Sequence, residues 1–223
     1  MNDSRVYTVR SSPVGFVPRA VWDASHWRDV EAGSIDSFPW SDKGPRPITQ
    51  FKVLYSRTAL HVIFQVRDRH VRCLTTRYGG PVWRDSCVEF FFCPNSVEGV
   101  GYFNFEANCG GTMLAAHQIA RDTDREALDG REARRLAVAH TMPRVVDPEI
   151  AGPVTWVVEY MVPLDMLTAR ASVIRPGPGA VWLGNFYKCA EANSHPHWGC
   201  WAPIRAPEPD FHRPEFFGVL EFV

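Results

Sequence analysis

The sequence lacks the features that mark membrane-spanning and nucleic-acid-binding proteins. No stretch approaches the roughly 20 apolar residues of a membrane span. With 24 basic and 25 acidic residues the net charge is −1, so no basic surface is indicated for nucleic acid or an anionic membrane. The opening residues, MNDSRVYTVR, contain no apolar run typical of a signal peptide. We expect a cytoplasmic protein, or a secreted one if a leader has been removed.

Motifs for nucleotide binding and nucleophilic catalysis are also missing. The sequence has no G-x-G-x-x-G, no phosphate loop and no G-x-S-x-G elbow. None of the six cysteines forms a C-x-x-C pair, so a zinc ribbon is not indicated. Most of them lie in apolar, strand-like runs, where cysteine behaves as a small buried hydrophobe. We therefore expect free thiols, and the sequence carries no signal for an oligomeric state.

What the sequence does contain is a series of short strand patterns. In 58–68, Leu60, Val62, Phe64 and Val66 alternate with more polar residues. Further strands are expected at 51–57, 86–93, 101–108, 111–118, 134–141, 154–162, 180–190 and 217–223. The 18 prolines favour many turns between short strands. The pattern predicts an all-β protein, an antiparallel β-sandwich of jelly-roll or immunoglobulin-like type, in one domain over 1–223.

Little helix is expected between these strands. Residues 122–130 could form one or two helical turns that stop at Gly130, and 163–167 a single turn opening on a proline. Long polar loops are expected at 23–47 and 191–216. The charged run 121–135 is interpreted as a solvated turn or short helix.

Two of the predicted strands carry unusual polar side chains. Asn104, Glu106 and Asn108 share one face of a strand, opposite Phe103 and Phe105. In the run "SCVEFFFC", Glu89 points with Cys87 and Phe91. A ladder of amides and carboxylates suits a polyhydroxylated ligand, although a merely solvated sheet face has the same pattern.

A third segment, "NFYKCAEANSHPHWGCWAP", adds polar and aromatic side chains in a predicted loop. Lys188 is a lone cation beside a strand, and His197, Trp198 and Trp201 follow it. Aromatic rings cover the C–H faces of sugars, while polar side chains bond their hydroxyls. Trp83 and Trp198 could therefore form the two walls of a sugar slot, since eight tryptophans exceed what one core needs.

Several blocks together resemble a known family. "WRDSCVEFFF", "YFNFEANCGGTML", "GNFYKC", "HPHWGCWAP" and "DFHRPEFFGVLEF" resemble the family-9 carbohydrate-binding modules, and most closely a stand-alone branch within the DOMON-like β-sandwiches. The resemblance covers roughly residues 20–223. It implies non-catalytic binding of a small saccharide or a glycan end, in proteins of polysaccharide catabolism, and a structural calcium ion.

The resemblance also implies roles for particular residues. In sugar-binding members two tryptophans sandwich the terminal sugar, and a glutamate six residues after the first bonds its hydroxyls; Trp83 and Glu89 match this spacing, with Trp198 as second wall. Asn104, Glu106 and Asn108 would extend the polar floor, and Lys188, His197 and Trp201 the rim. "NFEAN" departs from the arginine-containing strand of the family.

Three alternatives remain open from the residues. Glu89 and Glu106 could act together as the carboxylates of a glycoside hydrolase. Relatives of this sandwich carry heme, for which the sequence offers a set of possible axial ligands: Met113, Met142, Met161, His117, His140 and His197. A zinc site could use His195, His197, Asp210 and His212.

Overall fold

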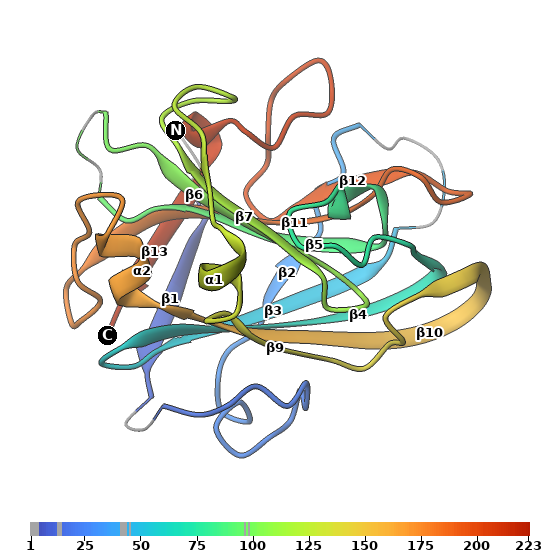
Figure 1. The fold of residues 1–223 in the computed structure, drawn as a ribbon, viewed down its shortest axis with the longest axis horizontal. Coiled ribbons are helices and arrows are strands. Elements are labelled where there is room, and N and C mark those ends of the chain that lie inside the picture. The colour runs from blue at the N-terminus through green and yellow to red at the C-terminus, as the bar shows by residue number, and fades with distance from the viewer. Residues whose placement is uncertain (1–4, 13–14, 41–43, 45, 96, 98) are drawn as a thin grey trace.

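A computed structural model describes residues 5–12, 15–40, 44, 46–95, 97 and 99–223. Within this part of the chain, strands dominate and form two facing layers (Figure 1). The first layer has the order β8-β7-β6-β5-β11-β13, with β12 also pairing with β11. Its strands are β5 (Cys87–Cys93), β6 (Tyr102–Asn108), β7 (Met113–Gln118), β8 (Glu126–Ala127), β11 (Val181–Ala190), β12 (His197–Cys200) and β13 (Gly218–Phe222).

The second layer has the order β3-β4-β10-β9, with β2 on the other side of β3. Its strands are β2 (Gly33–Ile35), β3 (Ile48–Tyr55), β4 (Ala59–Cys73), β9 (Ala137–His140) and β10 (Val146–Pro163). Strand β1 (Val6–Ser11) joins the layers, because it pairs in parallel with both β13 and β3. The predicted all-β sandwich is confirmed, but the sheet is mixed rather than purely antiparallel.

The short helices differ in part from the expectation. Helix α2 (Leu164–Thr168) follows Pro163 as predicted. The expected helix at 122–130 is wrong: this stretch contains β8, and helix α1 (Gly130–Ala133) begins at the glycine expected to stop it. The Asp129 side chain accepts hydrogen bonds from the backbone amides of Arg131 and Glu132. The Glu132 side chain in turn accepts one from the backbone amide of Asp129. This capping box sets the start of the helix. Two single turns, η1 (Val82–Arg84) and η2 (Pro214–Phe216), complete the elements.

The main core lies between the two layers and consists mostly of aromatic side chains. Phe186 of β11 stacks on Phe51 of β3, with ring centroids 3.5 Å apart, and on Phe90 of β5 at 4.4 Å. Phe105 of β6 reaches Tyr160 of β10 at 6.5 Å. Because successive side chains of a strand point to opposite faces, this core leaves the other face of β5, β6 and β11 directed outward.

The outward face of the second layer is covered by residues 15–30. The side chain of Glu159, on β10, is buried and accepts three hydrogen bonds there. Its donors are the amides of Arg19 (2.8 Å) and Ala20 (2.7 Å) and the indole Nε1 of Trp27 (2.9 Å). One carboxylate thus fastens a segment about 140 positions earlier in the chain to the sheet.

This attachment predicts a stability effect. Glu159→Ala leaves two buried donors and one partly buried donor without an acceptor and should lower the free energy of unfolding by about 2–4 kcal/mol. Denaturant unfolding measures it, with Glu159→Gln expected to lose less because one acceptor oxygen remains. Glu221→Ala, at an exposed position of β13, is the control. An equal effect of the two alanine variants would contradict the role given to Glu159.

Candidate functional site

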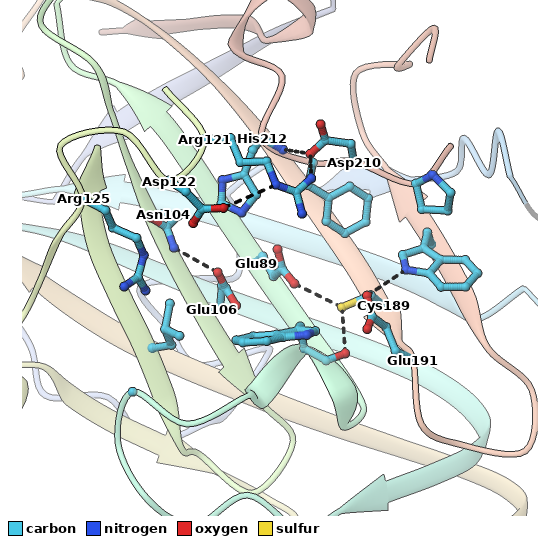
Figure 2. A pocket seen from close by; sticks show the side chains of 16 residues that line it. Glu89, Asn104, Glu106, Arg121, Asp122, Arg125, Cys189, Glu191, Asp210 and His212 are labelled. Atoms are coloured by element: carbon cyan, nitrogen blue, oxygen red, sulfur yellow. Dashed lines mark hydrogen bonds and ion pairs between the residues drawn. The ribbon is translucent and has the colours of Figure 1, made fainter. Parts of the chain in front are cut away.

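A cavity of about 460 Å³ lies on the outward face of the first layer. Strands β5, β6 and β11 form its floor, while η1, β12 and the segments around 121–125 and 209–212 surround it (Figure 2). Polar and aromatic side chains dominate its lining. The lining residues are Gly79, Trp83, Glu89, Asn104, Glu106, Leu114, Arg121, Asp122, Arg125, Cys189, Glu191, Trp198, Pro209, Asp210, Phe211 and His212.

Two glutamates lie side by side on the floor. Glu89 of β5 and Glu106 of β6 are paired in the strand register, so their side chains leave the same face of the sheet. Both are almost completely buried. Asn104 donates a 2.9 Å hydrogen bond from Nδ2 to Oε1 of Glu106 and accepts a 3.4 Å bond from Gln118. The floor is therefore an ordered array of carboxyl and amide groups.

Burial changes the charge state of these carboxyl groups. Desolvation raises the pKa of Glu106 to about 7, while the bond from Asn104 and the charge of Arg125 act in the opposite direction. The pKa of Glu89 is also raised well above its ordinary value, first by desolvation and then by Cys189 and Glu106. A protonated carboxyl group both donates and accepts hydrogen bonds, as a sugar hydroxyl does.

Two thiols lie next to Glu89. The Sγ of Cys189 donates to Oε1 of Glu89 at 3.1 Å, and Cys87 is opposite Cys189 in the register of β5 and β11. The three side chains bring their ligand atoms within 4.8 Å of one another and are all buried. Burial is the largest cause raising the pKa of both thiols. They are free, as are the other cysteines, all of which lie in the described residues.

Charged side chains of the segment after β7 form one edge of the cavity. Arg121 makes a 2.7 Å ion pair with Asp210, and Figure 2 shows Arg125 directed toward Asn104 and Glu106. Both arginines belong to the run 121–135, whose charge pattern predicted only a solvated turn or short helix. An arginine expected on the "NFEAN" strand is absent there. The positive charges come instead from Arg121 and Arg125. The local sequence pattern does not predict that their segment folds back over the sheet.

The imidazole of His212 closes this edge. Its Nδ1 lies 2.8 Å from the hydroxyl of Tyr102 and 3.0 Å from Nε2 of Gln118. Its backbone amide donates to Asp210 at 2.9 Å. Burial, followed by the charge of Arg121, lowers the pKa of His212 to about 4, so the ring is neutral near pH 7. It therefore adds no positive charge to the cavity.

Three aromatic side chains also line the cavity. Trp83 belongs to η1 and Trp198 to β12, and both are half-buried. The indole of Trp198 donates to Glu191 at 3.4 Å, and its backbone is opposite Cys189 in the register. Phe211 stacks on Tyr187 at 4.1 Å. The structure thus brings together five of the residues proposed from the sequence: Trp83, Glu89, Asn104, Glu106 and Trp198.

Four other proposed residues do not line the cavity. Asn108 is buried, and its side-chain amide donates hydrogen bonds to the Thr75 carbonyl and to Asp85. Its side-chain oxygen accepts one from the Thr112 amide. Trp201 is buried in the core, 5.9 Å from Phe51, and therefore does not form a rim. His197, expected in a loop, begins β12 and is buried.

Lys188 is excluded from the cavity by strand alternation. It follows Tyr187 and precedes Cys189, so it points to the core side of β11. There its Nζ lies 3.6 Å from a carboxylate oxygen of Asp68 and donates to Nε2 of His197 at 2.8 Å. Burial and this cation lower the pKa of His197 to about 3. Lys188 and His197 are thus internal partners of each other.

The residues of the alternative zinc site are dispersed in the structure. His195 lies beside His70, His197 beside Lys188, and Asp210 and His212 at the cavity, so these four do not form a zinc site. Among the proposed heme ligands, Met113 is in the core, while His117 bonds the carbonyl of Val100 and His140 that of Met142. Among the described residues, neither group of three clustered ligands offers the all-oxygen set that calcium prefers.

No helix in the described part of the chain is long and apolar enough to cross a membrane.

Fold and cavity define a ligand-binding β-sandwich whose polar site lies outside one layer. The family described as "Carbohydrate-binding family 9" matches residues 21–222. The chain belongs to this family. No curated protein matches the chain.

Solved structures agree with this assignment. A candidate carbohydrate-binding protein from Bacteroides uniformis ATCC 8492 has a TM-score of 0.88 and 26% identity, over 99% of this chain and 100% of that one. A family-9 carbohydrate-binding module from Caldicellulosiruptor kristjanssonii, in complex with glucose, has a TM-score of 0.66 and 14% identity, over 98% and 96%. Its complex with cellotriose gives the same values, with 93% of that chain covered. At 14% identity the likeness concerns the fold.

The raised pKa of Glu106 predicts a pH-dependent effect of its substitution. Between its ordinary pKa of 4.5 and about 7, the folded state retains a proton that the unfolded state has lost. Its contribution to the free energy of unfolding therefore falls as the pH rises through this window. Glu106→Gln should differ little from wild type at pH 4.5 and be more stable by about 1–3 kcal/mol at pH 8.

Denaturant unfolding at several pH values measures this difference. Glu221→Gln serves as control, because it removes an exposed side chain and no buried acid. A difference between Glu106→Gln and wild type that stays constant from pH 4.5 to 8 would show that burial does not hold this proton.

Proposed function

We propose that the protein binds the end of a saccharide in the cavity above β5, β6 and β11, without breaking a bond. The observation that carries the proposal is the pairing of a buried carboxyl and amide floor with half-buried tryptophans around one cavity. Its volume of about 460 Å³ lies within the range of small-ligand pockets. Membership of carbohydrate-binding family 9, and the glucose and cellotriose complexes of a relative, support the choice of ligand class.

The polar floor suits hydroxyl groups better than it suits ions. Burial shifts Glu89 and Glu106 toward their protonated forms, and Asn104 offers an amide beside them. An anionic ligand would meet two carboxyl groups, whereas a metal cation would compete with their protons. Neutral hydroxyls can exchange donor and acceptor roles with all three side chains. Arg125 adds a donor at the edge of the floor.

The tryptophans supply the apolar part of the site. In the proposed complex Trp83 stacks on the C–H face of the sugar ring, and Trp198 closes the other side. Contacts of this kind and neutral hydrogen bonds contribute only about 0.5–1.5 kcal/mol each, net of water. We therefore expect modest affinity, dominated by a few contacts.

Hydrolysis is the second candidate, since Glu89 and Glu106 are neighbours in the cavity. A retaining glycosidase needs one protonated and one ionised carboxyl group on either side of the scissile bond. Here both groups leave the same sheet face, and burial raises the pKa of both. Neither carboxyl group is held fully ionised at pH 7, as the nucleophile of that mechanism would be, and the matching family is one of binding modules. Binding is the better supported function.

Substitution of the stacking residues tests the proposal. Trp83→Ala and Trp198→Ala should each weaken saccharide binding about ten-fold or more, equivalent to about 1.4 kcal/mol, while the fold is retained. Calorimetry with glucose, cellobiose, cellotriose and a panel of other sugars measures binding, and circular dichroism checks the fold.

Trp22→Ala is the matched control. Trp22 is also half-buried, but it belongs to the segment that covers the second layer, where Lys52 lies over its ring. Binding unaffected by Trp83→Ala, or lost equally in Trp22→Ala, would overturn the proposed slot. Release of reducing sugar from cellotriose, absent in Glu106→Gln, would favour hydrolysis instead.

A further inference from the structure

We propose that His70, Glu149 and His195 form a zinc site that fastens the segment 191–196 to the second layer. These residues come from β4, from β10 and from the connection between β11 and β12. Their ligand atoms all lie within 4.8 Å of one another. The site is separate from the carbohydrate cavity, none of whose lining residues belongs to it.

An irregularity in β10 directs the carboxylate toward this point. Val146 is opposite Cys73, whereas Ile150 is opposite Val71. The β10 stretch from Asp147 to Glu149 therefore faces a single β4 residue. Such a bulge reorients side chains and is common at functional positions. It brings Glu149 beside His70, with Oε1 3.5 Å from Nδ1.

The two imidazoles are held in a parallel arrangement. The rings of His70 and His195 stack with centroids 3.7 Å apart and an interplanar angle of 23°. Both present Nδ1 to the hydroxyl of Ser194, at 3.4 Å and 2.8 Å. The same hydroxyl donates to Glu149. Two ring nitrogens and one carboxylate oxygen thus converge on the Ser194 hydroxyl, which would rotate aside for an ion to take its place.

This set of donors fits zinc. Two histidines and a glutamate form a known three-residue ligand set for Zn²⁺, whose fourth position is filled by water or another oxygen ligand. Ser194 or water can supply that oxygen. Calcium prefers oxygen ligands alone and fits poorly. Binding requires that each ligating Nδ1 be unprotonated, so uptake of Zn²⁺ releases any hydrogen carried there.

The connection carrying His195 is already positioned for this role. Asn193 donates from Nδ2 to the carbonyl of His70 at 2.9 Å and accepts from the amide of His195 at 3.0 Å. The guanidinium of Arg72 donates to the carbonyl of Ala192 at 3.2 Å. The ligands are thus oriented by surrounding bonds, as in metal sites generally.

A bound ion would affect the neighbouring cavity. Glu191, the first residue of the segment 191–196, and Trp198, two residues after its end, both line the cavity. The carbonyl of His195 also accepts from Nδ1 of His197, the residue before Trp198. Zinc at His195 would therefore hold the second tryptophan wall in place, a consequence that rests on the proposed carbohydrate binding.

Metal titration without any saccharide tests the site itself. Chelator-treated protein is titrated with Zn²⁺ by calorimetry and with Co²⁺ by visible absorption. Wild type should bind one ion per chain, and His195→Ala and Glu149→Gln should each weaken binding about ten-fold or more. Hydrogen exchange should slow at residues 191–196 when Zn²⁺ is added to wild type, but not to His195→Ala.

Two controls make the result specific. His26→Ala removes a half-buried histidine of the segment covering the second layer and should bind like wild type. Cys189→Ser tests the other cluster of three ligands, Cys87, Glu89 and Cys189. A thiolate-to-cobalt charge-transfer band that Cys189→Ser abolishes would move the ion to the cavity and overturn the proposal. So would unchanged binding by His195→Ala, or no binding by wild type.

Saccharide titrations with and without Zn²⁺ then separate the two proposals. Metal binding with no binding of any sugar would leave the zinc site standing and refute the carbohydrate function. Sugar binding by a protein that takes up no metal would refute only the zinc site.

Discussion

Alternation of side chains along β5, β6 and β11 is the constraint on which the rest of the structure depends. One face of these strands must supply the aromatic core between the layers, through residues such as Phe90, Phe105 and Phe186. The intervening residues are then directed outward together. The register pairs Glu89 with Glu106 and Tyr187 with Glu89, so the position of each polar side chain follows from the packing of its neighbours. The core and the floor of the cavity are two faces of the same strands.

Cover over this outward face decides its chemistry. Left open to water, Glu89 and Glu106 would be ordinary ionised carboxylates. The segments around 121–125 and 209–212 fold over them, and burial then favours the neutral acid. The same cover keeps His212 neutral. Carboxyl, amide and imidazole groups destabilise a purely structural core, because burying a polar group costs free energy unless it is hydrogen-bonded. The same groups can form hydrogen bonds with hydroxyl-rich ligands.

The connection between β11 and β12 links two parts of the molecule with different chemistry. Its ends reach the cavity through Glu191 and Trp198, while its middle lies against β4 and β10 through His195 and Asn193. Trp198 belongs to β12, which follows this connection directly. A connection fastened at its centre restricts the movement of that strand and, in the proposed binding mode, lowers the entropy lost when a ligand binds.

Much of the fold and five of the residues that line the cavity could be predicted from the sequence alone. Strand periodicity identified β4 to β7, and the spacing from Trp83 to Glu89, with Asn104 and Glu106 on one face, indicated residues that do line the cavity. These are local features, set by the two-residue period of a strand. Which segments fold over that face was decided only in three dimensions, because Arg121, Arg125 and His212 come from segments without a periodic signal. Trp201, just after β12, enters the core, where its amide donates to the carbonyl of Phe186. Lys188 shows the difference most clearly. Its sequence position beside the polar strand suggested a rim, but alternation within β11 directs it inward to Asp68 and His197.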